Sequence, residues 1–128
     1  MNFCTYFDSK YISFGFSLLE SLYKHYNDKG IYVLCLDQDT LLLTKKFFPK
    51  VITITLSEIE NAYKDLLSIK VQRPATEYIW TLTPHLIEYL IQHKNVDFIT
   101  YLDSDQYFFD TPKTIIDEVK FHSISILP

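Results

Sequence analysis

Two aspartates, Asp103 and Asp105, stand on either side of Ser104 directly after an apolar run at 98–102. That run has the composition of a buried strand, which we expect to be parallel and central in its sheet. Residues two apart in an extended chain project to the same side, so the two carboxylates should point the same way where the strand ends. Adjacent like charges need a counter-charge, and a divalent cation with oxygen ligands is the natural partner. The pattern predicts a metal site, and the alternative is a pair of exposed loop carboxylates.

The composition predicts a single globular domain over residues 1–128, of which 48% are hydrophobic and 22% charged. A net charge of -4 without a basic block argues against nucleic acid as a partner. The apolar runs are too short to cross a membrane, and the first residues lack the features of a secretory signal. Cys4 and Cys35 lie in strand-like segments, which predicts reduced core residues. We therefore expect a cytoplasmic protein, with peripheral membrane association and homo-oligomerisation left open.

Alternating strand and helix patterns predict an α/β fold, a doubly wound and mainly parallel sheet in three α/β/α layers. The expected strands are 2–7, 31–36, 51–56, 98–102 and 123–127, and the expected helices are 10–26, 40–48, 57–69, 75–93 and 113–121. A capping box starting at Ser57 is expected to open the third helix. In such sheets ligands bind beyond the carboxyl ends of strands, near the switch in strand order. The ends of the first and fourth strands are therefore the candidate site.

Three segments together resemble the GT-A nucleotide-sugar glycosyltransferases, close to the family 8 type. They are FCTYFDSKYISFGFSLLESL, RPATEYIWTLTPHLIEYLI and ITYLDSDQYFFDTP, and they span most of the chain. The resemblance implies a Rossmann-like GT-A fold, of which this chain would be the N-terminal donor-binding part. It also implies transfer of a sugar from a nucleoside-diphosphate sugar, a UDP-sugar in our prediction, to an unknown acceptor.

The resemblance gives the D-x-D motif a definite role. Asp103 and Asp105 match the positions that hold Mn²⁺ or Mg²⁺ against the donor diphosphate, and Ser104 between them would contact the donor. Oxygen ligands suit either cation and do not choose between them. The departing diphosphate gains negative charge as the glycosidic bond breaks, and a bound cation would stabilise that charge.

The resemblance also assigns residues that would hold the nucleotide. By the family pattern these are Thr5 and Tyr6 through their main chain, Asp8 by a hydrogen bond and Tyr11 by stacking on the base. The alternatives are that Asp8 only caps a helix and that Tyr11 is an ordinary core or surface aromatic.

The segment before the metal motif departs from the family pattern. Family 8 members often have an arginine in the helix at 77–81 that faces the donor, and this chain has none there. Arg73 lies just upstream and is the candidate substitute for contact with the diphosphate, unless it is simply solvated. Trp80 would either wall the donor pocket or lie in the core. The sequence offers no candidate for a catalytic base.

Other functions remain open from the sequence alone. One alternative is a non-catalytic nucleotide-sugar-binding or self-associating module, in which an exposed apolar surface would favour self-association. An aspartate-nucleophile phosphatase also places D-x-D after a strand, but its motif strand tends to come first in the chain and Tyr107 replaces its usual threonine or valine. A calcium loop that includes Asp110 lacks the expected glycine and terminal glutamate.

Overall fold

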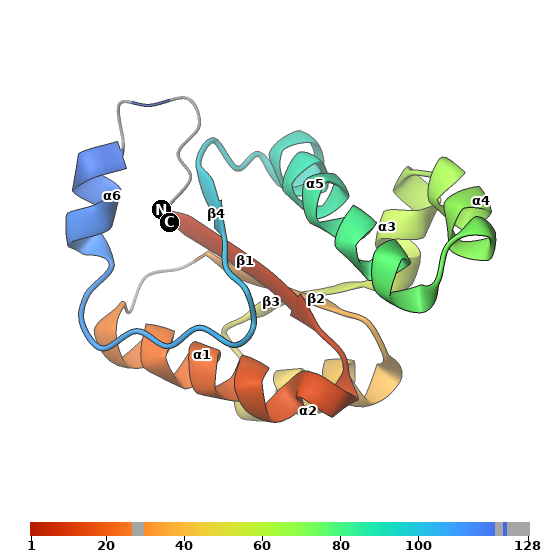
Figure 1. The fold of residues 1–128 in the computed structure, drawn as a ribbon. Coiled ribbons are helices and arrows are strands. Elements are labelled where there is room, and N and C mark those ends of the chain that lie inside the picture. The colour runs from red at the N-terminus through yellow and green to blue at the C-terminus, as the bar shows by residue number, and fades with distance from the viewer. Residues whose placement is uncertain (27–29, 120–121, 123–128) are drawn as a thin grey trace.

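Four parallel strands form one sheet in the order β3-β2-β1-β4 (Figure 1). The structure is a computed structural model that describes residues 1–26, 30–119 and 122. The strands are β1 (Asn2–Phe7), β2 (Ile31–Cys35), β3 (Ile52–Thr55) and β4 (Ile99–Tyr101). The α/β fold with a parallel sheet between helices is the predicted one.

Helices cover both faces of this sheet and complete three layers. One face packs against α3 (Leu56–Ala62), α4 (Asp65–Gln72) and α5 (Ala75–Lys94). The other face packs against α1 (Ile12–His25), α2 (Gln38–Phe47) and α6 (Lys113–Val119), with the 3-10 helix η1 (Ser9–Tyr11) leading into α1. Over the part of the chain that is described, no helix is long and apolar enough to cross a membrane.

The strand alternation divides β1 between two apolar cores. Cys4 faces the core under α5, whereas Phe3 and Phe7 face the core under α1. The second cysteine, Cys35 on β2, belongs to the α1 side, so the sheet separates the two thiols. Both are free and buried, as the sequence predicted, and burial raises the pKa of Cys4 to about 12 and that of Cys35 to about 11.

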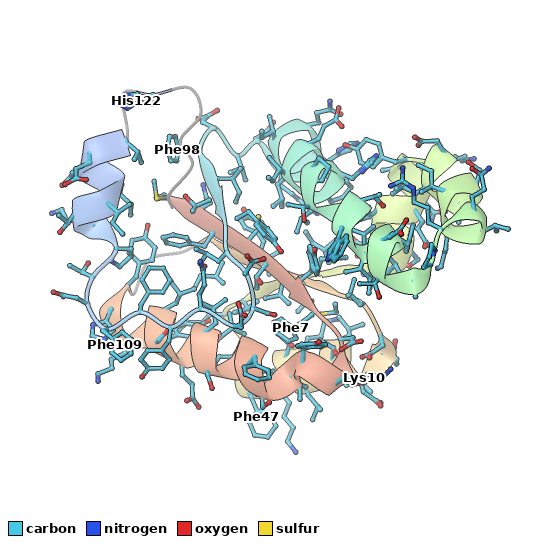
Figure 2. All side chains as sticks on the ribbon, viewed as in Figure 1. Phe7, Lys10, Phe47, Phe98, Phe109 and His122 are labelled. Atoms are coloured by element: carbon cyan, nitrogen blue, oxygen red, sulfur yellow. The ribbon has the colours of Figure 1, made fainter. Side chains whose placement is uncertain are left out.

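Gly15 allows α1 to approach the end of β1 closely. A methyl group at this position would collide with the ring of Phe7, which is 2% exposed and lies between β1 and α1 (Figure 2). The missing side chain therefore lets the first helix pack directly over the last residue of the first strand. This contact fixes where the chain leaves β1 at Asp8.

The region after β3 differs from the sequence-based prediction. The single helix expected at 57–69 is two helices, α3 and α4, and the capping box starts two residues earlier than expected. Thr55 accepts from the Glu58 N–H at 3.3 Å, and the Glu58 carboxylate accepts from the Thr55 N–H at 2.7 Å. The last residue of β3 thus starts the next helix. Pro84 lies inside α5.

The fourth strand is parallel, as expected, but among the described strands it lies at an edge of the sheet and not at its centre. Among the described strands β4 pairs with β1 alone and forms one edge of the sheet, and its residues are only half-buried. The strand expected at 123–127 and the last two residues of the helix expected at 113–121 lie outside the described residues. A run of apolar residues indicated a strand but did not reveal its place in the sheet.

Candidate functional site at the carboxyl edge of the sheet

The order of the strands reverses between β1 and β4. The chain proceeds outward from β1 to β2 and β3, and then returns to the other side of β1 to form β4. All four strands are parallel, so the carboxyl ends of β1 and β4 reach the same edge next to this reversal. The structure therefore brings the two predicted strand ends together.

Pairing between β1 and β4 stops before β1 ends. The last residue pair is Cys4 with Tyr101, followed by a hydrogen bond of 2.9 Å from the Leu102 N–H to the Cys4 carbonyl. Since alternate residues of a strand direct their backbone groups to opposite neighbours, the N–H and C=O of Tyr6 face the β4 side beyond this last bond. The main chain of Thr5 instead faces β2. Two main-chain contacts with the nucleotide were predicted. The main chain of Tyr6 is available for one at the carboxyl edge of the sheet, whereas the main chain of Thr5 faces β2 inside the sheet.

The side chain of Thr5 lies deep in the core under α1. Thr5 is 2% exposed, and among the described residues its hydroxyl has no hydrogen-bond partner. A buried hydroxyl without a hydrogen-bond partner lowers the stability of the fold. The side chain nevertheless faces the helix layer and not the strand edge.

The D-x-D motif forms a turn and does not continue the strand. The Gln106 N–H donates to the Asp103 carbonyl at 3.2 Å, which closes a turn over Asp103, Ser104 and Asp105. The expected extended alternation therefore does not apply to these carboxylates. Both aspartates are exposed and Ser104 is half-buried. The motif lies at the predicted edge, in a local conformation that the apolar run did not indicate.

A cluster of hydroxyl groups connects the turn with β1 and α5. Tyr101 donates its hydroxyl to Oδ1 of Asp103 at 3.1 Å, and its ring lies 5.6 Å from that of Tyr6. Thr83 of α5 donates to the Tyr6 hydroxyl at 3.2 Å. Burial is the main reason that the pKa of Tyr101 is raised well above its usual range, with Tyr6 and the charge of Asp103 adding to the effect.

Neither Tyr101 nor Thr83 was identified from the sequence as a site residue. Tyr101 had a usable signal, because it precedes Asp103 by two residues and strand spacing puts both on one side. Thr83 had none, since the fold alone brings residue 83 against residue 6.

Asp103 and Asp105 could supply two ligands to a cation whose other ligands are water and phosphate oxygens. Among the described residues an ion pair joins Lys70 to Glu60, and no lysine or arginine pairs with Asp103 or Asp105. The structure also shows, for the same residues, no group of three or more metal-ligating side chains. Mg²⁺ and Mn²⁺ accept a site of one or two carboxylates when water and phosphate oxygens complete the shell. The pair could thus hold such an ion with a diphosphate, but could not enclose one alone.

Asp8 caps the helix that follows β1. Its Oδ1 accepts from the N–H of Lys10 at 3.0 Å and of Tyr11 at 3.2 Å. The second carboxylate oxygen of Asp8 has no hydrogen bond among the described residues. Tyr11 ends η1 with its side chain 56% exposed and its ring 6.1 Å from that of Phe14. Asp8 therefore has the capping role considered as an alternative, and Tyr11 is a surface aromatic that remains free to stack.

Asp37 is a further residue of this edge that sequence reasoning missed. It follows β2, and its Oδ1 accepts from the Thr40 N–H at 2.8 Å, which caps α2. Its Oδ2 accepts from the Ser9 N–H at 2.8 Å, so the loop after β1 is tied to the loop after β2. Burial alone would raise the Asp37 pKa, but the hydrogen bonds from Ser9 and Thr40 outweigh it and lower the pKa to about 2.

The structure does not bring Arg73 together with the aspartates. Arg73 ends α4, is exposed, and forms no ion pair with either carboxylate in the part of the chain described. Trp80 is 66% exposed, so it is not a core residue, and it lies one turn of α5 before Thr83. Of these two candidates only Trp80 shares a helix face with the hydroxyl cluster.

An apolar groove of about 560 Å³ runs beside the edge strand β4. Its walls come from β4, α5 and α6, and Phe98 and His122, which are labelled in Figure 2, are among its lining residues. Tyr101 borders both this groove and the turn that carries Asp103. The groove therefore lies alongside the carboxyl-edge site and shares Tyr101 with it, whereas Tyr6, Asp103 and Asp105 do not line it.

No protein-family model matches the chain. The chain is 27% identical over 117 residues to the uncharacterized protein YfnF of Bacillus subtilis (strain 168). The matched region covers 90% of this chain and 38% of YfnF. It is 33% identical over 103 residues to the uncharacterized protein YfnD of the same organism. This matched region covers 79% of this chain and 32% of YfnD. The chain thus spans about a third of the length of the curated relatives it matches.

Proposed function

We propose that this chain is the donor-binding part of a metal-dependent glycosyltransferase of the GT-A type, with a UDP-sugar as donor. The observation that carries the proposal is the meeting of Tyr6 and the D-x-D turn at the reversal in strand order. This is where parallel α/β sheets bind their ligands. The resemblance of three segments to that family supports the same assignment.

In this proposal each residue of the edge has a separate task. The main chain of Tyr6, which has no backbone partner on the β4 side among the described residues, binds the nucleotide, and Tyr11 offers a surface ring for the base. Asp103 and Asp105 hold the cation with the donor diphosphate, and Ser104 borders them. When bound, a divalent cation neutralises the charge that the diphosphate gains as it leaves with the electron pair of the sugar–oxygen bond. No described residue is assigned as a catalytic base.

Calorimetric titration of UDP into the chain tests the proposal, once with Mn²⁺ and once with a chelator. We expect binding that depends on Mn²⁺, because two exposed carboxylates cannot attract a diphosphate without a cation between them. Mg²⁺ should replace Mn²⁺, since both accept oxygen ligands. Equal binding with the chelator, or none in either condition, contradicts the proposal.

Asp105→Ala gives the matching residue test. This variant should lose the metal-dependent part of UDP binding and keep its circular dichroism spectrum, because Asp105 is exposed on a turn. Asp97→Ala is the control: Asp97 is also an exposed aspartate, but it precedes β4 and so lies at the amino end of the strand. If Asp105→Ala unfolds the chain instead, the pair has a structural role.

Assays for turnover separate an enzyme from a binding module. Release of UDP from a UDP-sugar by the chain would support a transferase that uses water as a poor acceptor. Metal-dependent binding without any release would favour the non-catalytic module, which shares the same site residues. Hydrolysis of a generic phosphate ester that Asp103→Asn abolishes would favour a phosphatase.

A further inference from the structure

The side chain that touches the D-x-D turn from the sheet is Tyr101. Its backbone is fixed in β4 by pairing with Cys4, and its ring packs with that of Tyr6 against the core under α5. Asp103, by contrast, is exposed and lies on a turn. The Tyr101 hydroxyl is therefore the fixed partner in their 3.1 Å hydrogen bond, and the carboxylate is the movable one.

This hydrogen bond occupies one oxygen of Asp103, and among the described residues the other oxygen has no hydrogen bond. An exposed aspartate that lacks such a partner rotates among several side-chain conformations, and a cation must select one of them. With Oδ1 held by the hydroxyl, Oδ2 remains available to a cation. Partners of this kind around metal ligands contribute about 10- to 100-fold in metal affinity.

Support for the Tyr101 ring comes from outside β4. Thr83 of α5 donates to the Tyr6 hydroxyl, and the ring of Tyr6 lies against that of Tyr101 at an interplanar angle of 37°. Three segments far apart in the chain thus converge behind one carboxylate. The exposed Tyr107, on the other side of the turn, contacts Phe109 and makes no hydrogen bond to Asp103 among the described residues.

We propose that Tyr101 is a positioning residue that orients the Asp103 carboxylate to ligate a divalent cation. The inference rests on the proposed metal-dependent function and adds to it a residue that touches neither substrate nor cation. The distance of 3.1 Å is long for a hydroxyl that donates to a carboxylate. We therefore expect the Tyr101 hydroxyl to contribute about tenfold in metal affinity, the lower end of the range for such partners.

This role is tested by measuring Mn²⁺ binding to the full chain in the presence of UDP. Binding is measured as the loss of the free Mn²⁺ signal in electron paramagnetic resonance. Tyr101→Phe keeps the ring and removes the hydroxyl, so it should weaken Mn²⁺ binding about tenfold. The spectrum of the Mn²⁺ that still binds should also change in linewidth, since the ligand geometry is less uniform. Tyr107→Phe removes a hydroxyl from the same loop and should bind Mn²⁺ as the wild type does.

The outcomes separate the two proposals. If the wild type binds no Mn²⁺, the proposed function fails and this inference fails with it. If the wild type binds Mn²⁺ through Asp103 while Tyr101→Phe has unchanged affinity and spectrum, the positioning role is refuted and the function stands. Should Tyr101→Phe not fold, Thr83→Val removes the supporting hydroxyl and should weaken Mn²⁺ binding in the same direction, by a smaller factor. Unchanged binding in a folded Thr83→Val would then count against the role.

Discussion

Replacing Asp37 should destabilise the fold more than replacing any other acidic residue of its helix. One oxygen of Asp37 caps α2 through Thr40, and the other accepts from Ser9 in the loop after β1. Loss of a helix cap costs about 1 kcal/mol, and loss of a hydrogen bond to a charged group about 1.5 kcal/mol. Partial exposure of Asp37 reduces the second contribution, so we expect Asp37→Ala to lose about 2 kcal/mol of unfolding free energy.

The pH dependence of this effect has a definite sign. The Asp37 pKa falls from an ordinary 3.8 to about 2 in the folded chain, so the folded state favours the ionised form. The resulting stabilisation is complete above about pH 4 and is lost as the pH falls towards 2. Solvent screens this partly exposed carboxylate, so we expect the ionised form to contribute about 1 kcal/mol.

Urea unfolding of wild type and Asp37→Asn at several pH values measures this contribution. Asparagine keeps the shape and one acceptor oxygen but replaces the other oxygen by an amide donor, so the variant removes the charge together with one of the two accepted hydrogen bonds and resembles the protonated aspartic acid. The two proteins should differ by about 1 kcal/mol at neutral pH and converge between pH 4 and 2. Asp39→Asn removes the same charge from the exposed first turn of α2 and should cost about 0.5 kcal/mol. If Asp37→Asn and Asp39→Asn unfold alike at all pH values, the proposed link between the two loops is wrong.

Three further outcomes follow from the packing. Gly15→Ala should destabilise the chain by about 1–2 kcal/mol in urea unfolding, because overpacking against Phe7 outweighs the gain in helix propensity; a variant as stable as wild type would contradict that close contact. Tyr78→Phe should cost about 1–2 kcal/mol, since it removes the 2.7 Å hydrogen bond to the half-buried Glu60 carboxylate that joins α3 to α5; unchanged stability would show that the bond contributes nothing. The two buried cysteines, whose pKa values burial raises, should resist a thiol reagent in the folded chain and react in denaturant; fast labelling of the native chain would mean that one core opens readily.

The local pattern of the sequence determined the elements and most of their order. Apolar runs bounded by turn residues located β1, β2, β3 and β4, and helical periodicity located α1, α2 and α5, because burial on one side of an element leaves a period in the sequence. The same pattern placed the candidate aspartates after a strand, at the edge where parallel sheets bind ligands. It also predicted two buried, unpaired thiols.

Only the tertiary structure decided which residues meet at that edge. The sequence showed that β4 exists, but its position beside β1 at an edge of the described sheet depends on how the chain returns across the sheet. That return brings Thr83 and Tyr6 to Tyr101, and a neighbouring connection brings Ser9 to Asp37. Contacts between residues far apart in the chain leave no local period, because each forms through the packing of whole strands and helices. The residue types of the turn could therefore be read from the sequence, whereas the contacts of Thr83 and Tyr6 behind it could not.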